Sequence, residues 1–338
     1  MARAYPGTYY FLVRHLARIW GSGFEWFDSK PVYQLIQPLR RTWNLTLGQS
    51  FIRWLKRQSF DLVVATHFLP ADVCGAGKQR GWFKTRLVVV ITDLHPHRFW
   101  LAPEADAFVV ATEATAAECQ QRGIPRERLH VLGIPTARGF SLPVDRPALL
   151  RRFGLDATRL TLLVTSGGTT VGPFNRVVEA LLRLEDALPG RVQLVVVCGE
   201  NARAAARLER RVRTSPMPVK VFGFVDNMPE LMGSSDLVIA KAGGMTVTEA
   251  LNEGLPLILY HAIPGQEWFN AQYVSGHGAA IIARGPRAVT AAVRKFVERP
   301  EPFVAMRNAA RALSHPDAAE AIASQVIQPL LQSIVHSP

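Results

Sequence analysis

The stretch "AKAGGMTVTEALNEGLPLIL", residues 240–259, places a pair of adjacent glycines between two apolar runs. The runs "DLVIAK" (236–241) and "LPLILY" (255–260) have the length and composition of buried parallel strands, and "TVTEALNEG" (246–254) has the pattern of a connecting helix. In open parallel sheets a ligand binds at the carboxyl ends of the strands, where loops lead into helices. The stretch therefore predicts both a fold class and the position of a site.

The same alternation runs through most of the chain. Further strands are expected at residues 61–67, 86–93, 107–112 and 129–135, and then at 160–166, 192–199 and 219–225, with helices at 113–123, 175–188 and 202–213. A strand, a helix and a strand in succession favour right-handed crossovers and a parallel sheet with helices on both faces. We expect an α/β protein of two Rossmann-like, doubly wound domains that face each other across a cleft.

The length of 338 residues suits two domains of about 150 residues each. Residues 138–155 contain two prolines and no strand pattern, so they indicate the boundary. We expect an N-terminal acceptor and membrane-facing domain over residues 1–145 and a C-terminal donor-binding domain over 146–315. Residues 316–338 are predicted to form a helix that packs back toward the N-terminal domain.

The composition is that of a globular protein, with 48% hydrophobic and 20% charged residues. Cys74, Cys119 and Cys198 are far apart and odd in number, which indicates neither a disulfide framework nor a CxxC metal site. No apolar run approaches the roughly 20 residues that span a bilayer, and Arg14 and Arg18 interrupt "YYFLVRHLARIW". We expect a cytoplasmic protein whose membrane contact is peripheral.

The first sixty residues are unusually basic and aromatic. Nine Lys and Arg residues stand there against Glu25 and Asp28, a net charge of +7. The aromatic residues of the same segment are Tyr9, Tyr10, Phe11, Trp20, Phe24, Trp26, Phe27, Trp43 and Trp54. Basic residues mixed with such rings suit an anionic lipid surface. Nucleic acid is the rival partner, but no nucleic-acid motif accompanies the charge, and a solvated basic face is the third reading.

Two glycine pairs lie at strand-to-helix turns, in "VTSGGTTVG" (164–172) and "AKAGGMTVTEA" (240–250). Glycine lets the backbone turn tightly and approach a ligand, and free N–H groups at a helix start attract an anion such as a diphosphate. Neither loop has the Gly-Lys-[Ser/Thr] ending of a Walker motif or the GxGxxG pattern. A P-loop NTPase and a dinucleotide oxidoreductase are therefore disfavoured.

Several polar residues near these turns have two readings. Thr246 and Glu249 have the spacing of a capping box, but a carboxylate there could also accept both hydroxyls of a ribose. The amide and carboxylate side chains of "HAIPGQEWFNAQYV" (261–274) suit sugar hydroxyls, or they begin a solvated helix. In "VFGFVDNM" (221–228), Phe222 and Phe224 are either core residues or neighbours of a flat base, which the backbone of Val225 could recognise.

Taken together, these residues resemble a family of glycosyltransferases. The blocks "VFGFVDNMPELMGSSDLVI" (221–239) and "KAGGMTVTEALNEGLPLILYHAIPGQEWFNAQYV" (241–274) are similar to the donor-site signature of the GT-B, family 28 type group that contains monogalactosyldiacylglycerol synthases, processive diacylglycerol glucosyltransferases and MurG. The segments "VVATHFLP" (63–70), "VVVITDLHPHRFWLAPEADAFVVAT" (88–112) and "VLGIP" (131–135) look more like the diacylglycerol branch.

The resemblance implies an inverting transfer of hexose from UDP-galactose or UDP-glucose, a co-substrate rather than a cofactor, to diacylglycerol. It places near the diphosphate the residues Ser166, Gly167, Gly168, Gly243, Gly244, Met245 and Thr246. Phe224 and Val225 would meet uracil, Glu249 the ribose, and Gln266, Glu267 and Asn270 the hexose. No cofactor or metal is expected, because no Asp-x-Asp motif is present and helix N-termini can hold a diphosphate.

The family's opening strand, glycine-rich loop with a histidine, and helix are missing from this sequence, so the N-terminal domain is expected to be truncated. A stop codon directly upstream of Met1 would reject truncation. The missing histidine is the usual candidate for the catalytic base. The substitutes are Asp93, His95 and His97 in "TDLHPHRFW" and His67 in "THFLP", each of which could instead pack or cap a helix.

Three rival functions stay open at this stage. A MurG-like enzyme would transfer N-acetylglucosamine to a polyprenyl-linked acceptor, and labelled UDP-sugars with either lipid would separate the two. A binding protein without turnover would bind UDP and give no product. An isomerase of nucleotide sugars would change the free UDP-sugar with no lipid present.

Overall fold

The computed structural model describes residues 23–335, apart from residues 25, 59 and 169–171. The chain divides into two compact units. The first unit holds the described residues up to Pro135, the short segment Pro264–Gln266, and the residues from Asp317 on; the second holds Thr136–Ile263 and Glu267–Pro316. The predicted α/β class with parallel sheets is confirmed.

Residues 138–155, which we expected to mark the boundary between the domains, are folded as part of the second unit. They contain the 3-10 turn η3 (Arg138–Ser141) and helix α7 (Arg146–Phe153), which Gly154 ends in a left-handed conformation at φ +60°. Arg152 on α7 pairs with Glu230 of α11 (Met228–Gly233) at 2.8 Å. The chain accordingly enters the second unit at Thr136, ahead of the boundary that we expected at 145.

The first unit contains a parallel sheet of four strands in the order β1-β2-β3-β4. Its elements are α3 (Lys30–Leu47), α4 (Gln49–Gln58), β1 (Leu62–Ala65), α5 (Phe68–Gln79), β2 (Arg86–Val90), η1 (Arg98–Trp100), β3 (Ala107–Val110), α6 (Glu113–Gln121), η2 (Arg126–Arg128), β4 (Leu129–Val131), α16 (Ala318–Ile322), the π-helical turn η4 (Ala323–Ile327) and α17 (Gln328–Val335).

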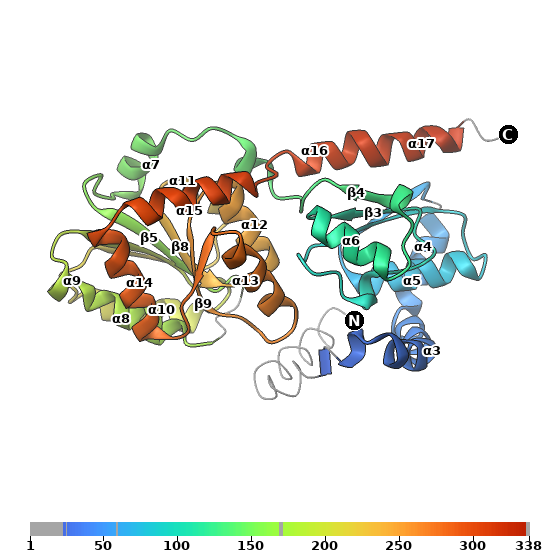
Figure 1. Ribbon diagram of the computed structural model, residues 1–338, viewed down its shortest axis with the longest axis horizontal. Coiled ribbons are helices and arrows are strands. Elements are labelled where there is room, and N and C mark those ends of the chain that lie inside the picture. Colours follow the sequence, from blue (N-terminus) through green and yellow to red (C-terminus); the bar gives the residue numbers. More distant parts are fainter. Residues whose placement is uncertain (1–22, 25, 59, 169–171, 336–338) are drawn as a thin grey trace. The chain divides into compact units, whose positions relative to one another are not determined.

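Both faces of this sheet are buried by helices. Leu87 and Val89 of β2 pack in the core that α5 and α6 cover, whereas Val88 and Val90 point to the opposite face. There they pack with Ile322 and with Val326 of the C-terminal helical segment. Figure 1 shows α16 and α17 running along β3 and β4. Covered faces on both sides explain why β2 is a continuous apolar run rather than an alternating one.

The second unit contains a parallel sheet of six strands in the order β10-β9-β8-β5-β6-β7. Besides η3, α7 and α11, its elements are β5 (Leu160–Thr165), α8 (Phe174–Leu182), α9 (Leu184–Ala187), β6 (Val192–Val197), α10 (Ala202–Val212), β7 (Val219–Phe222), β8 (Leu237–Lys241), α12 (Gly244–Asn252), β9 (Leu257–His261), α13 (Gln266–Gly276), β10 (Ala280–Ile282), α14 (Pro286–Glu298) and α15 (Glu301–Ala312).

The strand order reverses between β5 and β8. The chain builds β5, β6 and β7 outward in one direction and then returns to build β8, β9 and β10 in the other. Leu162 of β5 therefore has Leu194 of β6 on one side and Leu237 of β8 on the other. Figure 1 shows β5 and β8 at the centre of the second unit. A doubly wound sheet offers its ligand crevice at this reversal, at the carboxyl ends of the two strands.

Candidate functional site

The two glycine pairs follow β5 and β8, so both lie at the strand-order reversal. Gly167 has φ +71°, and a Cβ atom there would lie 3.7 Å from Cε of Lys241, the last residue of β8. The bend after β5 also contacts the loop after β6, because the amide of Glu200 donates to the carbonyl of Gly168 at 3.0 Å. The carboxyl ends of β5, β6 and β8 thus meet around the backbone of the first glycine bend, at Gly167 and Gly168.

Helix α12 begins at this surface with an uncapped N-terminus. It starts at Gly244, and its N-cap residue Gly243 has no side chain to accept a hydrogen bond. The N–H groups of Gly244, Met245 and Thr246 precede the first intrahelical donor, Val247, which donates to the carbonyl of Gly243 at 3.0 Å. Free amides at the positive end of a helix dipole form an anion site.

Thr246 and Glu249 do not form the capping box that their spacing suggested. The helix begins at Gly244, so Thr246 is already inside its first turn. Among the residues that the structure describes, the carboxylate of Glu249 has no hydrogen bond or ion pair, and burial alone raises its pKa to about 7. The capping interpretation is therefore wrong, and a half-buried carboxylate without a protein partner lies one turn from the free amides of α12.

Glu267 and Asn270, on one face of α13, brace the second glycine bend. Glu267 is 4% exposed; one of its carboxylate oxygens pairs with the ammonium of Lys241, and the other accepts the amide of Ile263 at 2.9 Å. The side-chain amide of Asn270 donates to the carbonyl of Ala242 at 3.3 Å. These contacts hold the ends of β8 and β9 together, and contact of either side chain with a hexose stays a prediction.

The remaining predicted donor residues differ in position. Ser166 is fully buried beneath the first glycine bend. Phe224 follows β7 and is 72% exposed, so the interpretation of this ring as a core residue is wrong. The next residue, Val225, is half-buried. Gln266 is the first residue of α13 and belongs to the first unit. The structure thus gathers the diphosphate and ribose candidates at one edge of the sheet, with the base candidates two strands away.

Sequence reasoning missed two residues that shape this edge. Lys241 ends β8 directly before the glycine pair, and a strand-terminal lysine next to such a pair is a signal that could have been used. Gly199 follows β6 with φ +58°, and a Cβ atom there would lie 2.6 Å from the carbonyl oxygen of Gly168. Its position after the apolar run "VQLVVVCG" was visible, but the carbonyl that it accommodates comes from another loop.

In the first unit, His95 is held between two carboxylates. Its Nδ1 lies 2.8 Å from Glu118, and its Nε2 lies 3.5 Å from Asp28. Burial alone would lower the pKa of His95, but the hydrogen bonds to Asp28 and Glu118 outweigh it and raise the pKa. Arg122 pairs with the same Asp28 at 2.6 Å. Burial would raise the pKa of Asp28, but the hydrogen bonds from His95 and Arg122 outweigh burial and hold this pKa far below its ordinary value. Because both ring nitrogens of His95 lie near carboxylates, its protonated form is favoured, and that form is a poor general base.

His97 and His67 also use their ring nitrogens in local structure. His97 is 3% exposed, its Nδ1 accepts the amide of Phe99, its Nε2 lies 3.1 Å from the carbonyl of Phe24, and burial lowers its pKa to about 4. His67 is the N-cap of α5, where Nδ1 accepts the amide of Leu69 at 3.2 Å. A neutral ring that accepts at Nδ1 carries its proton on Nε2 and cannot take another there.

Asp93 is the fourth candidate, three residues past the end of β2, and it is 8% exposed. A carboxylate has two oxygens and about four acceptor positions, so it can accept a proton while it holds other contacts. The four residues therefore lie at the carboxyl ends of β1 and β2, and Asp93 is the carboxylate among them.

Helix α3 has an inverted polarity. Its buried residues are Arg41 and Asn44, which bond to Glu104 at 2.7 Å and to Asp72 at 2.8 Å. Its exposed face carries Leu35, Leu39 and Trp43 at helical spacing, which are 81%, 74% and 63% exposed. A helix on a globular protein normally turns its apolar stripe inward. Of the N-terminal residues that we counted as basic or aromatic, those before Gly23 lie outside the described part of the chain.

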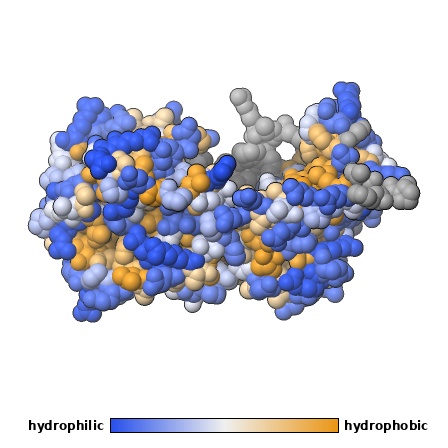
Figure 2. Space-filling model, turned by 90° about the horizontal axis from the view of Figure 1, so that it is seen from above, coloured by the Kyte–Doolittle hydropathy of each residue, from blue (hydrophilic) through white to orange (hydrophobic). Residues whose placement is uncertain are grey.

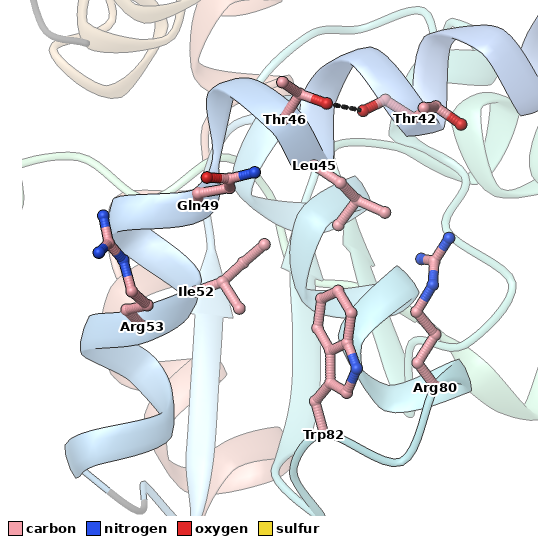
Figure 3. A pocket seen from close by; sticks show the side chains of 8 residues that line it. All are labelled: Thr42, Leu45, Thr46, Gln49, Ile52, Arg53, Arg80 and Trp82. Carbon is pink, nitrogen blue, oxygen red and sulfur yellow. Dashed lines mark hydrogen bonds between the residues drawn. The ribbon is translucent and has the colours of Figure 1, made fainter.

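A pocket of about 350 Å³ lies between α3, α4 and the turn after α5. Figure 3 shows Leu45 and Ile52 facing the ring of Trp82, with Arg53 and Arg80 on opposite sides. The pocket therefore has an apolar floor and a basic rim. No helix in the part of the chain that the structure describes is long and apolar enough to cross a membrane.

Two family descriptions match this chain. Residues 2–136 match monogalactosyldiacylglycerol (MGDG) synthase, and residues 161–322 match the C-terminal domain of glycosyltransferase family 28. A curated relative, a processive diacylglycerol beta-glucosyltransferase of Bacillus thuringiensis (strain Al Hakam), is 27% identical over 320 residues, which cover 94% of this chain and 79% of the relative.

Solved structures share the fold at low sequence identity. A complex of S. aureus MnaA with UDP matches with a TM-score of 0.66 and 15% identity, over 89% of this chain and 83% of that one. MurG of Acinetobacter baumannii matches with a TM-score of 0.61 and 18% identity, over 84% of this chain and 78% of that one. At these identities the likeness concerns the fold alone.

Proposed function

This chain belongs to the family 28 type glycosyltransferases of the GT-B fold, which use UDP-sugars, and from that premise we propose that it moves glucose or galactose from the UDP-sugar to diacylglycerol at a membrane surface. The observation that supports the donor half most directly is the uncapped start of α12, one turn from the unpaired carboxylate of Glu249.

The donor chemistry follows from the charges at the strand-order reversal. The diphosphate is the leaving group, and the negative charge on it grows as the glycosidic bond breaks. The amides of Gly244 to Thr246 and the helix dipole of α12 stabilise that charge, whereas the ammonium of Lys241, beside the same bend, is already paired with Glu267. Glu249, once ionised, accepts the two ribose hydroxyls. The protein thus supplies the positive field without a metal ion.

The acceptor half of the proposal depends on the outward apolar face of α3. Figure 2 shows hydrophobic patches among hydrophilic side chains on the face that it draws, and exposed apolar atoms are common on any protein. Helix α3 differs because the polar residues Arg41 and Asn44 are buried, while the large apolar residues Leu35, Leu39 and Trp43 are exposed. Exposed Arg53, Lys56 and Arg57 on the adjoining α4 suit lipid phosphates.

The proposal assigns the catalytic base to Asp93. The acceptor hydroxyl attacks the anomeric carbon as its proton leaves, and the carboxylate of Asp93, at the carboxyl end of β2, is a group of the chemical type that takes up such a proton. We expect Asp93→Asn to lower kcat by about 10² to 10⁴-fold, the usual contribution of a general base, with UDP affinity unchanged. His67→Gln is the matched variant, and it keeps a side-chain acceptor for the N-cap. A larger loss in the His67 variant than in the Asp93 variant would transfer the role to His67.

The test of the function is a lipid assay. The purified chain is incubated with labelled UDP-glucose or UDP-galactose and vesicles that contain diacylglycerol, and the lipid products are separated by thin-layer chromatography. A labelled glycolipid is expected with one of the two donors. A parallel sample with UDP-N-acetylglucosamine and a polyprenyl-linked acceptor tests the MurG-like alternative. Conversion of the UDP-sugar without lipid, or UDP binding with no product under any pairing, would contradict the proposal.

A further inference from the structure

A second, strongly basic hollow lies in the second unit, away from the glycine bends. It is a pocket of about 690 Å³ between α8 and α14, and its lining includes Arg176, Arg183, Arg284, Arg287 and Arg294, with Glu179 as the acidic residue. Figure 1 shows α8 and α14 side by side. Their apolar residues pack in the core of this unit, which leaves the arginines on the outer side of the helix pair. All five arginines are exposed.

The spacing of the arginines places them along one groove. Arg176 of α8 and Arg183, the C-cap residue of that helix, are seven residues apart, and Arg287 and Arg294 have the same spacing on α14. Seven residues are two helical turns, so each pair shares one face, about 10.5 Å apart along the axis. Both helices follow parallel strands and run in the same direction. The arginines therefore form two groups along the groove. Arg176, Arg284 and Arg287 lie near the starts of the helices, and Arg183 and Arg294 lie two turns further along.

The charge in this groove is not balanced by the protein. In the part of the chain that the structure describes, Arg176, Arg183, Arg287 and Arg294 have no ion pair, and the guanidinium of Arg284 lies 4.4 Å from the ring centroid of Trp268. Glu179 is shared with Arg207 of α10 at 3.4 Å. No acidic residue stands in the first turn of α8 or of α14. Five arginines thus surround the groove, and the carboxylate of Glu179, the acidic residue in its lining, is already paired with Arg207.

The start of α14 adds to this positive field. Its N-cap is Gly285, at φ +84°, which has no side chain to cap the helix. The amides of Arg287 and Ala288 precede the first intrahelical donor, Val289, which donates to the carbonyl of Gly285 at 3.2 Å. Free amides and guanidinium groups thus converge on the same end of the groove, and both bind oxyanions.

We propose that the groove between α8 and α14 binds a phosphate-bearing anion at a site separate from the donor pocket. The planar guanidinium group matches the oxygens of a phosphate in a two-point contact, which an ammonium cannot provide. None of the residues that we assign to the donor site lines this groove. The phosphate could belong to the headgroup of an anionic lipid or to a free phosphate ion, and the two sources share the same chemistry.

The test removes the two arginines of α14 that line the groove and measures phosphate binding. The variant Arg287→Gln/Arg294→Gln is compared with Arg151→Gln/Arg213→Gln, which removes two exposed arginines that do not line the groove. Inorganic phosphate is titrated calorimetrically with UDP in excess, so that the donor pocket is occupied. In a second arm, flotation measures binding to phosphatidylcholine vesicles with and without phosphatidylglycerol. Binding of UDP itself is recorded for each protein, so a failure of the donor site is seen separately.

The groove variant should weaken phosphate binding, or the preference for phosphatidylglycerol vesicles, by about tenfold or more, since charge-assisted contacts are lost. The control variant should leave both unchanged. A loss in the vesicle arm alone assigns the site to a lipid headgroup, and a loss in the calorimetric arm alone assigns it to a free phosphate. Equal binding by the groove variant and the control in both arms would overturn the proposal, whether or not UDP binds.

Discussion

Two glutamates with the same kind of perturbation lie at different places on α12. Burial raises the pKa of Glu249 and of Glu253 to about 7. Glu249 lies five residues after Gly244, whereas Glu253 is the C-cap residue at the far end of the helix, with Oε1 buried and without a hydrogen bond to any described residue. The pair therefore separates the effect of a buried carboxylate from the effect of its position next to the glycine bends.

Removal of the Glu249 carboxylate should weaken UDP binding. We expect Glu249→Gln to lower the affinity by roughly 10 to 100-fold, because hydrogen bonds from the ribose hydroxyls to a charged acceptor are lost. Wild-type affinity should rise with pH through about 7, where the carboxylate loses its proton, and the variant should lose this dependence. Calorimetric titration of UDP across that range measures both effects. Glu253→Gln is the control, and an equal loss of affinity there would contradict the role of Glu249.

The same carboxylates affect folding with the opposite sign. Their pKa in the folded protein lies above the model value of 4.5, so ionisation favours the unfolded chain. The cost is absent well below that value and complete above about 7. Because both carboxylates are partly exposed and screened by water, each Glu→Gln variant without ligand should gain only about 1 to 2 kcal/mol in the free energy of unfolding at alkaline pH and almost nothing in acid. Urea denaturation at both extremes measures this, and a gain in acid would contradict the argument.

At the scale of single elements, two glycines of the second unit differ in what a side chain at their position would contact. Gly199 and Gly190 both have left-handed backbones, at φ +58° and φ +71°. A Cβ atom at Gly190 would meet nothing within 4 Å, whereas one at Gly199 would lie 2.6 Å from the carbonyl oxygen of Gly168 and 2.7 Å from that of Gly167. Gly199 therefore allows the loop after β6 to support the first glycine bend.

The two positions give a matched pair of substitutions. Gly190→Ala should cost about 1 kcal/mol of stability, the strain of a left-handed alanine, and leave UDP binding unchanged. Gly199→Ala should cost more, because the first glycine bend must move, and it should also lower UDP affinity. Urea denaturation gives the stability and calorimetry the affinity. If Gly199→Ala costs no more than Gly190→Ala and binds UDP normally, the bend does not depend on this contact.

The sequence predicted best those elements whose structure follows from a pattern within one short stretch of residues. Buried parallel strands give continuous apolar runs, so β5, β6 and β8 were found within a few residues of their ends. The start of α12 was predicted two residues late, because the pattern at Thr246 fits a capping box while the backbone at Gly243 already begins the helix. The helix expected over residues 175–188 is divided into α8 and α9 at Arg183.

The features that the sequence did not predict depend on contacts between distant residues. The composition of the first sixty residues indicated a lipid surface, but the inverted polarity of α3 depends on the bonds of Arg41 to Glu104 and of Asn44 to Asp72. The basic groove brings Arg176 together with Arg287, which lie on helices separated by five strands along the chain. Neither arrangement leaves a pattern within a single stretch.

At the scale of the whole molecule, the net charge of +12 is concentrated on particular surfaces. One is the face of α3 and α4, where exposed Arg53, Lys56 and Arg57 adjoin the apolar stripe of α3. Charges on an exposed surface attract anionic lipids over about a Debye length and are screened by salt, whereas apolar side chains that enter the lipid are not. The two contributions can therefore be separated by the salt dependence of binding.

The apolar contribution predicts a specific loss of membrane binding. Leu35 and Leu39 are 81% and 74% exposed, and partial burial of each in lipid is worth about 1 kcal/mol. The variant Leu35→Gln/Leu39→Gln should bind phosphatidylglycerol vesicles about thirtyfold more weakly at high salt, with UDP affinity unchanged. Turnover of diacylglycerol in vesicles should fall in parallel. The variant Leu142→Gln/Val304→Gln, which removes two apolar side chains that are 53% and 57% exposed in the second unit, is the control. Wild-type binding by the α3 variant in flotation would show that another surface holds the protein at the membrane.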